Sequence, residues 1–224
     1  MQCFKSSKQR ATVGQILLAH GAGAGSQSDF MQRTATLMAE GGVTTWLFDF
    51  SYMQRMMAEG KRRPPDRMPK LQAAFNSAID EVQLSPDYDA TLGLYIGGKS
   101  MGGRVATHLL TSDVLQARKP DGSTCSIMGG VILGYPFTPP GKQNLRTEHF
   151  DDMARPVIIA QGQRDAFGGE ALVSELNLPE SITTIILPDG DHSFKPRKAS
   201  GESLEGNMEL MVNRALEWMC RTKR

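Results

Sequence analysis

The sequence predicts an α/β fold: a mostly parallel sheet of about six strands with helices packed on both faces. Two observations predict this fold. From Gly14 onward, short apolar runs alternate with amphipathic stretches, as expected of parallel strands that helices bury on both sides. The chain has 224 residues, of which 40% are hydrophobic, enough to bury a complete core in one domain. We therefore expect a single domain over residues 1–224, with residues 1–13 as a poorly ordered N-terminal extension.

The individual elements can be assigned in chain order. The apolar runs expected to be strands cover residues 14–19, 43–48, 91–96, 127–133, 156–161 and 183–188. Apolar residues at helical spacing predict helices that begin after Ser28 as N-cap and near Pro69, and a final helix from Met208 to Met219. Residues 50–69 and 134–155 lack both periodicities, so we expect irregular connections there. The first of these is either a solvated loop or cover for a pocket at the end of the sheet.

Charge and cysteine usage exclude several classes of function. The chain has 25 Lys plus Arg and 24 Asp plus Glu, a net charge of +1, which removes the main electrostatic argument for nucleic acid or an anionic membrane as a partner. The cysteines, Cys3, Cys125 and Cys220, are widely separated and show no CxxC spacing, which favours a reducing compartment. No apolar stretch precedes Ile16, so the N-terminus is not a secretory signal and the cytoplasm is expected.

The most informative motif lies in residues 92–110, which read as a strand, a tight turn and a helix. The turn, Gly98-Lys-Ser-Met-Gly102, matches the GxSxG nucleophile elbow, in which glycines let strand and helix approach closely while the serine is strained. Ser100 would project from the end of the sheet as the nucleophile. The backbone N–H of Met101, at the start of the new helix, would donate to a developing oxyanion.

A rival pattern covers the same residues. Gly93 to Ser100 also satisfies GxxxxGK[ST], the phosphate-binding P-loop. A P-loop needs a strand before Gly93, where the polar segment 85–90 is turn-like, and it would turn the expected strand 91–96 into a loop. We therefore prefer the elbow.

A serine nucleophile needs a histidine base and a carboxylate that orients it, and in this architecture the acid precedes the histidine. Asp165 follows the strand 156–161, and His192 follows the strand 183–188 in a DGDHSF turn. Both would therefore lie at the same end of the sheet as Ser100. Asp189 and Asp191 are competing acids, but Asp165 comes from a neighbouring strand and can face the other imidazole nitrogen.

The first strand runs into His20-Gly-Ala-Gly-Ala-Gly25, a loop of small residues that exposes its backbone amides. In a hydrolase this loop supplies the second oxyanion donor, which we expect to be the N–H of Ala22. The alternative is a dinucleotide site, with Asp49 at the end of the second strand binding a ribose. Ser26 stands where that fingerprint has its third glycine, and the dinucleotide interpretation leaves the expected triad without a role.

These motifs together resemble a known family. HGAGAG, GGKSMGGR, GYPFTPPGK, QGQRDAFG and DGDHSF are similar to those of compact α/β-hydrolases, a group of uncharacterised bacterial proteins with eukaryotic relatives, namely a testis-expressed protein and a subunit of a nucleosome-acetylating complex. The resemblance runs from about Gly14 to the C-terminus. It implies an α/β-hydrolase core with a minimal cap or none, and a Ser100, Asp165, His192 triad by position. It implies no particular substrate.

The leading hypothesis is a serine hydrolase that needs no cofactor and no metal and acts on a small-molecule ester, thioester or amide. We expect its substrate to contact Gly23, Tyr52, Lys99, Tyr135 and Phe137. Two hypotheses of other classes stay open: a binding or scaffold protein that retains the elbow without using it, and a nucleotide-binding oxidoreductase. The basic run of residues 61–63 is expected to point outward into solvent.

Overall fold

The computed structural model describes residues 1–6, 13–111, 117–118, 124–125, 127–139, 141–142 and 144–222. Its main sheet has seven strands in the order β1-β3-β2-β4-β7-β8-β9, parallel throughout except where β1 pairs with β3. The strands are β1 (Gln2–Phe4), β2 (Gly14–Ala19), β3 (Val43–Phe48), β4 (Leu94–Lys99), β7 (Ile127–Leu133), β8 (Val157–Gly162) and β9 (Ile182–Leu187). A separate two-stranded antiparallel pair consists of β5 (Ala117–Arg118) and β6 (Thr124–Cys125).

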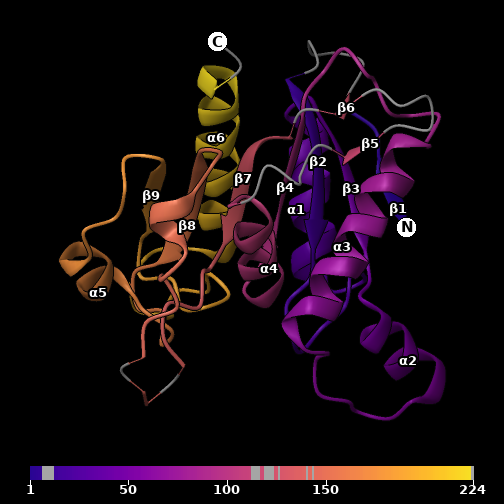
Figure 1. Ribbon diagram of the computed structural model, residues 1–224. Coiled ribbons are helices and arrows are strands. Elements are labelled where there is room, and N and C mark those ends of the chain that lie inside the picture. The colour runs from indigo at the N-terminus through magenta and orange to yellow at the C-terminus, as the bar shows by residue number, and fades with distance from the viewer. Residues whose placement is uncertain are drawn as a thin grey trace.

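Helices cover both faces of the sheet, which makes three layers (Figure 1). One face packs against α3 (Met68–Gln83) and α4 (Met101–Leu109), and the other against α1 (Asp29–Glu40) and α6 (Leu204–Thr222). Side chains of β2 alternate between the two cores: Leu17 belongs to the first and Leu18 to the second, both with no exposed surface. Burial on both sides explains why the strands read as continuous apolar runs.

The predicted α/β class is confirmed, and five of the six predicted strands agree with the structure within one residue at each end. The third lies three residues later than expected, at Leu94–Lys99, so it includes Gly97 and Gly98. A Cβ on Gly97 would lie 1.9 Å from the Val131 carbonyl oxygen of neighbouring β7. These two strand positions therefore require glycine, because the neighbouring strands lie too close to leave room for a side chain.

The chain also contains elements that periodicity missed. Residues 2–4 form β1 against β3, with Gln2 opposite Leu47, so the expectation of a poorly ordered extension is wrong at its start; residues 7–12 lie outside the described part. Three residues are too few to show a period, and pairing with β3 supplies their order. Short elements were missed as well: α5 (Glu170–Glu175) and the 3-10 helix Phe150–Asp152.

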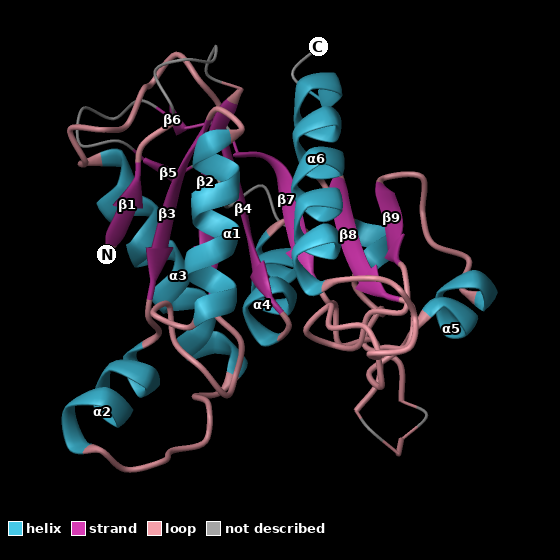
Figure 2. Cartoon of the chain, turned by 180° about the vertical axis from the view of Figure 1, so that it is seen from behind, coloured by secondary structure: helices cyan, strands magenta, loops and turns pink. Residues whose placement is uncertain are grey.

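The expected irregular connection 50–69 contains α2 (Ser51–Glu59), which projects from the body of the molecule (Figure 2). Tyr52 and Met53 are the buried residues of α2, and Gly60 ends it in a left-handed conformation with φ 63°. The basic residues 61–63 are all exposed, as predicted. The helix was missed although Tyr52, Met53 and Met56 follow helical spacing, because it is only nine residues long and is followed by a segment rich in basic residues and proline.

Two stacked imidazoles join α4 to the connection 134–155. The rings of His108 and His149 lie 3.8 Å apart between centroids, at an interplanar angle of 17°. The Thr107 hydroxyl donates to the Arg104 carbonyl at 2.8 Å, so it accepts from His149 Nε2 at 2.9 Å. His149 Nδ1 is then a buried acceptor without a partner among the described residues. The pKa of His149 is lowered to about 4, mainly by burial and to a smaller extent by the neighbouring His108.

This lowered pKa predicts a specific acid sensitivity. The unfolded chain, with a histidine pKa near 6.5, binds this proton more readily than the folded chain, so stability falls as pH drops from about 6.5 towards 4. Acid lowers the free energy of unfolding of the native protein. We expect this decrease to be smaller by on the order of 2 kcal/mol in His149→Gln, which keeps a donor for Thr107. Urea unfolding at about pH 7 and pH 4.5 measures it, and equal losses in both proteins would contradict it.

Candidate active site

Ser100 lies at a sharp bend between β4 and α4. It adopts φ 49° and ψ −111°, a strained conformation for a residue other than glycine. Its N–H donates to the Leu133 carbonyl of β7 at 3.0 Å, which holds the bend against the sheet. A Cβ on Gly102 would lie 2.5 Å from the His20 carbonyl oxygen, so only glycine lets α4 pack this closely on the end of β2. The sequence motif thus corresponds to a real elbow, and the P-loop interpretation is wrong because Leu94–Lys99 is strand.

The bend brings Ser100 to the loop after β9. Its Oγ lies 2.8 Å from His192 Nε2, and His192 Nδ1 lies 2.7 Å from Asp165 Oδ2. The three side chains therefore form one continuous hydrogen-bonded chain. An ionised Asp165 can only accept, which places the proton on Nδ1 and leaves Nε2 to accept from the Ser100 hydroxyl. The imidazole is partly exposed and the carboxylate has no exposed side-chain surface.

The carboxylate of Asp165 is held by donors besides His192. Gln161 Nε2 donates to Oδ2 at 2.9 Å, and the Phe167 N–H donates to Oδ1 at 2.8 Å. Gln161 is itself buried, and its Oε1 accepts from the Tyr135 N–H at 2.8 Å. The ring of Phe167 covers the imidazole of His192 at 4.3 Å between centroids. Gln161 and Phe167 are thus supporting residues that the sequence analysis missed.

The two competing acids are engaged elsewhere. Asp189 pairs with Arg164 and Arg197, and the hydrogen bond from the Arg197 side chain is the main cause that lowers the pKa of Asp189 to about 2. Asp191 Oδ1 accepts the backbone N–H groups of Ser193 at 2.8 Å and of the residue two further on. Both carboxylates therefore shape the loop that carries His192 and leave Asp165 as its partner.

The glycine-rich loop after β2 is tied down by side chains from the end of β3 and from α2. The two carboxylate oxygens of Asp49 accept the Ser26 N–H at 2.7 Å and the Ser26 hydroxyl at 2.6 Å. His20 Nδ1 lies 2.6 Å from the Gly21 carbonyl, and the Phe50 N–H donates to Nε2 at 3.2 Å. Asp49 thus holds the loop instead of projecting freely to bind a ribose, which removes the main support for the dinucleotide interpretation.

Tyr52 of α2 also holds the glycine-rich loop in place. Its hydroxyl donates towards the carbonyls of Gly21 at 3.3 Å and Ala22 at 3.1 Å, and its side chain is fully buried. The prediction that Tyr52 contacts substrate is therefore wrong, because its one polar atom faces the loop. Within the described residues, no protein acceptor is found for the N–H of Ala22 or of Met101, which leaves both expected oxyanion donors available.

Tyr52→Phe is expected to disturb catalysis more than folding. The change leaves two loop carbonyls without this donor, which costs about 1 kcal/mol, and frees the segment that carries the Ala22 N–H. For the ester hydrolysis that the sequence predicts, we expect kcat to fall by about tenfold with KM little changed, since oxyanion contacts are strongest in the transition state. Steady-state kinetics with a thermal unfolding curve test this, and an unchanged kcat would show that Tyr52 does not position the loop.

A cavity of about 330 Å³ opens beside Ser100. Its walls come from four segments: residues 21–24; Ser28, Phe30 and Met31 around the start of α1; Lys99 and Ser100 at the elbow; and Phe167, His192 and Ser193. The predicted contacts Gly23 and Lys99 do line it.

Tyr135 and Phe137 do not line this cavity. Both are fully buried, pack on one another and on Phe150, and the Tyr135 hydroxyl donates to the Arg146 carbonyl at 2.6 Å. Their prediction as substrate contacts is wrong because they turn into the core. The walls from Phe30, Met31 and Phe167 were missed, since nothing in the sequence distinguishes them from core residues.

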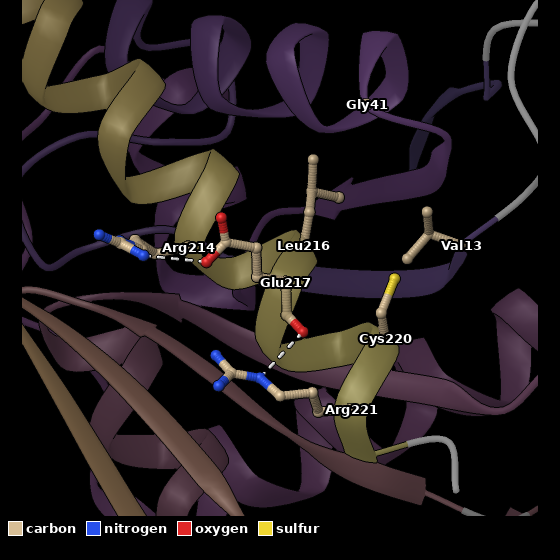
Figure 3. A pocket seen from close by; sticks show the side chains of 7 residues that line it. All are labelled: Val13, Gly41, Arg214, Leu216, Glu217, Cys220 and Arg221. Carbon is tan, nitrogen blue, oxygen red and sulfur yellow. Dashed lines mark hydrogen bonds and ion pairs between the residues drawn. The ribbon is translucent and has the colours of Figure 1, made fainter.

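A larger hollow of about 740 Å³ lies at the other end of the sheet. Figure 3 shows Val13, Leu216 and Cys220 at its edge, with Arg214 paired to Glu217 beside them. Val13 precedes β2, whose opposite end leads into the glycine-rich loop, so this hollow is remote from Ser100. In the described residues no group of three His, Cys, Asp or Glu side chains could hold a metal ion, and no helix is long and apolar enough to cross a membrane.

Comparison with known proteins agrees with this geometry. A family profile described as an alpha/beta hydrolase domain matches residues 12–220. A dienelactone hydrolase from Anabaena variabilis is 20% identical, with a TM-score of 0.63 over 98% of this chain and 89% of that one. Est1E from Butyrivibrio proteoclasticus is 15% identical, with a TM-score of 0.64 over 96% and 92%. An α/β serine hydrolase without lid from Xanthomonas campestris is 15% identical, with a TM-score of 0.62 over 96% and 87%. Identities this low show the shared fold.

Proposed function

The chain belongs to the α/β-hydrolase family, and on that basis we propose that it is a serine hydrolase acting on a small ester, thioester or amide. One observation carries the proposal: the unbroken chain from Ser100 Oγ to His192 at 2.8 Å and from His192 to Asp165 at 2.7 Å. A serine hydroxyl is a weak nucleophile until a base takes its proton, and this arrangement supplies that base already oriented.

The reaction proceeds in two acyl transfers. Ser100 Oγ attacks the substrate carbonyl while His192 Nε2 takes the hydroxyl proton, and Asp165 stabilises the resulting imidazolium. When the tetrahedral intermediate collapses, the bond to the leaving group breaks and His192 returns the proton to it. Water then attacks the acyl-enzyme with His192 again as base, which releases the acid and restores Ser100.

The negative oxygen of each tetrahedral intermediate is expected to lie between two backbone N–H groups. We propose those of Ala22, which lines the cavity, and of Met101, which directly follows Ser100. Met101 begins α4, so the positive end of that helix adds to its donor. Such donors typically contribute 10²-fold or more in rate because charge develops on the oxygen only in the transition state.

Covalent labelling tests the proposal without knowledge of the substrate. A fluorophosphonate probe phosphonylates an activated serine and should label the native protein at Ser100. Labelling should disappear in Ser100→Ala and in heat-denatured protein, because an unactivated hydroxyl reacts far more slowly. Failure of the native, folded protein to react, or equal labelling of Ser100→Ala, would refute the assignment.

The alternatives have less support. A scaffold protein has no need for Ser100, His192 and Asp165 in hydrogen-bonding contact, or for a cavity beside them. A relationship to the testis-expressed and acetylating-complex proteins stays a prediction based on the motifs. We also propose a cytoplasmic location; the free thiols of Cys3 and Cys220 among the described residues are compatible with a reducing compartment.

A further inference from the structure

In the part of the chain that the structure describes, the cavity beside Ser100 is lined by one lysine and by no acidic residue. Of the residues that line it, only Lys99 and His192 carry titratable side chains, and none is acidic. The acid of the proposed triad, Asp165, lies behind the imidazole with no exposed side-chain surface. A Cβ on Gly23 would meet nothing within 4 Å, so the backbone of the glycine-rich loop is open to an occupant. The cavity wall that the described residues form therefore includes one lysine and the backbone of the glycine-rich loop, and no acidic side chain.

Lys99 supplies that cation from a buried position. The residue is 9% exposed, and its ammonium donates to the His192 carbonyl. It also lies 5.3 Å from the ring centroid of Phe30, which itself lines the cavity, and 5.5 Å from that of Phe194. Within the described part of the chain, no carboxylate comes within ion-pair distance of it. An ammonium has three donors, so the backbone contact leaves two of them available.

A buried cation without a counter-ion is destabilising. Burial lowers the pKa of Lys99 to about 8, although the more distant Asp165 and Asp191 oppose this shift. The lysine is therefore still largely charged at neutral pH while its charge is poorly compensated. An anionic group entering the cavity would supply the missing partner, whereas a purely apolar acyl chain would bury the charge further.

We propose that the substrate is an ester or thioester whose acyl chain carries a carboxylate, and that Lys99 binds this carboxylate while Ser100 attacks the carbonyl. The inference rests on the proposed hydrolase function and names its substrate class. Lys99 directly precedes Ser100 in the chain, and a cavity of about 330 Å³ suits a small acyl group. Half-esters of short dicarboxylic acids, such as succinic acid, carry the carboxylate and have an acyl group small enough for this cavity.

A matched pair of esters tests this inference. Monomethyl succinate and methyl isocaproate have acyl chains of nearly the same shape, but a neutral isopropyl group replaces the carboxylate in the second. Hydrolysis is followed by titration of the released acid at constant pH. We expect the native protein to prefer monomethyl succinate at least tenfold in kcat/KM. Lys99→Met should lower kcat/KM about 100-fold for the succinate ester and by a much smaller factor for the isocaproate ester, because only the succinate ester loses a charge partner.

A control variant shows whether an effect of Lys99→Met comes from its contact with the substrate or from the loss of one positive charge. Lys195→Met removes an exposed lysine from the same loop as His192 and should leave both substrates unaffected. A native preference for methyl isocaproate would overturn the inference without use of any variant. Equal losses on both esters in folded Lys99→Met would also overturn it, because the lysine would then serve only to hold the His192 carbonyl.

A binding measurement tests the anion site separately from the proposed hydrolase activity. Ser100→Ala can be titrated calorimetrically with monomethyl succinate whether or not the native protein hydrolyses esters. Binding that weakens about 100-fold in the Lys99→Met, Ser100→Ala double variant supports the anion site even if labelling has refuted the hydrolase. Absence of binding, or equal affinity in both variants, overturns the anion site even if labelling succeeds.

Discussion

Ser100→Ala is expected to lower kcat for short p-nitrophenyl esters by about 10⁶-fold, the loss typical of removing one member of a cooperating triad. The remaining groups cannot compensate, because His192 then has no hydroxyl to deprotonate and no acyl-enzyme forms. A residual rate of about 10³-fold above the uncatalysed reaction should survive from the oxyanion donors and substrate binding. Steady-state rates on a highly purified variant measure this loss.

A serine elsewhere on the chain serves as the control. Ser174 lies exposed on α5, where its hydroxyl donates to the Glu170 carbonyl at 2.8 Å, so Ser174→Ala should keep the native rate. Ser100→Ala removes only a hydroxyl and leaves the core unaltered, so thermal unfolding should show a folded protein. A folded Ser100→Ala with more than a tenth of the native rate would mean that hydrolysis occurs at another group.

Asp165→Asn should reduce kcat by about 10⁴-fold while leaving the fold intact. The carboxylate now accepts three hydrogen bonds, from His192 Nδ1, Gln161 Nε2 and the Phe167 N–H. An amide has one oxygen, so its NH₂ group must face either His192 and Gln161 or the Phe167 N–H. In the first orientation the histidine presents a lone pair to the amide and a proton to Ser100, which disables it as a base.

The pH dependence of this variant distinguishes a tautomer effect from loss of structure. We expect its activity to recover partly at high pH, where hydroxide can replace the missing base, while the native protein gains little. Asp191→Asn is the matched control: it keeps the acceptor used by the Ser193 N–H, so its rate should stay within threefold of native. A large loss in Asp191→Asn, or none in Asp165→Asn, would reassign the acid.

The elbow was predictable because its constraints are local. Glycines at fixed spacing around Ser100, an apolar run before them and a helical stripe after them all lie within a short stretch of chain. The positions of the inner strands were predictable for a related reason, since strands that are buried on both faces appear as short, largely apolar runs. The short edge strand Gln2–Phe4 could not be found in this way, because its order comes from pairing with β3.

The choice among the three candidate acids needed both the sequence and the folded structure. Chain order favoured Asp165, but Asp189 and Asp191 were equally available by composition and closer to His192 in sequence. Only the fold shows that Arg164 and Arg197 engage Asp189, and that Asp191 binds backbone amides of its own turn. Ion pairs between distant residues leave no periodic trace in a sequence, so their effect on a candidate site is invisible until the chain is folded.

Sequence alone therefore determined the positions of six strands, the bend that carries the nucleophile and the loops from which its partners come, because each of these shows in residues close together along the chain. Tertiary structure decided the walls of the cavity. Tyr135 and Phe137 were predicted as substrate contacts but turn into the core, while Phe30 and Phe167, which were not predicted as contacts, line the cavity beside Ser100. Which side of a loop meets a cavity depends on what packs against its other side, and that is set by residues far away in the chain.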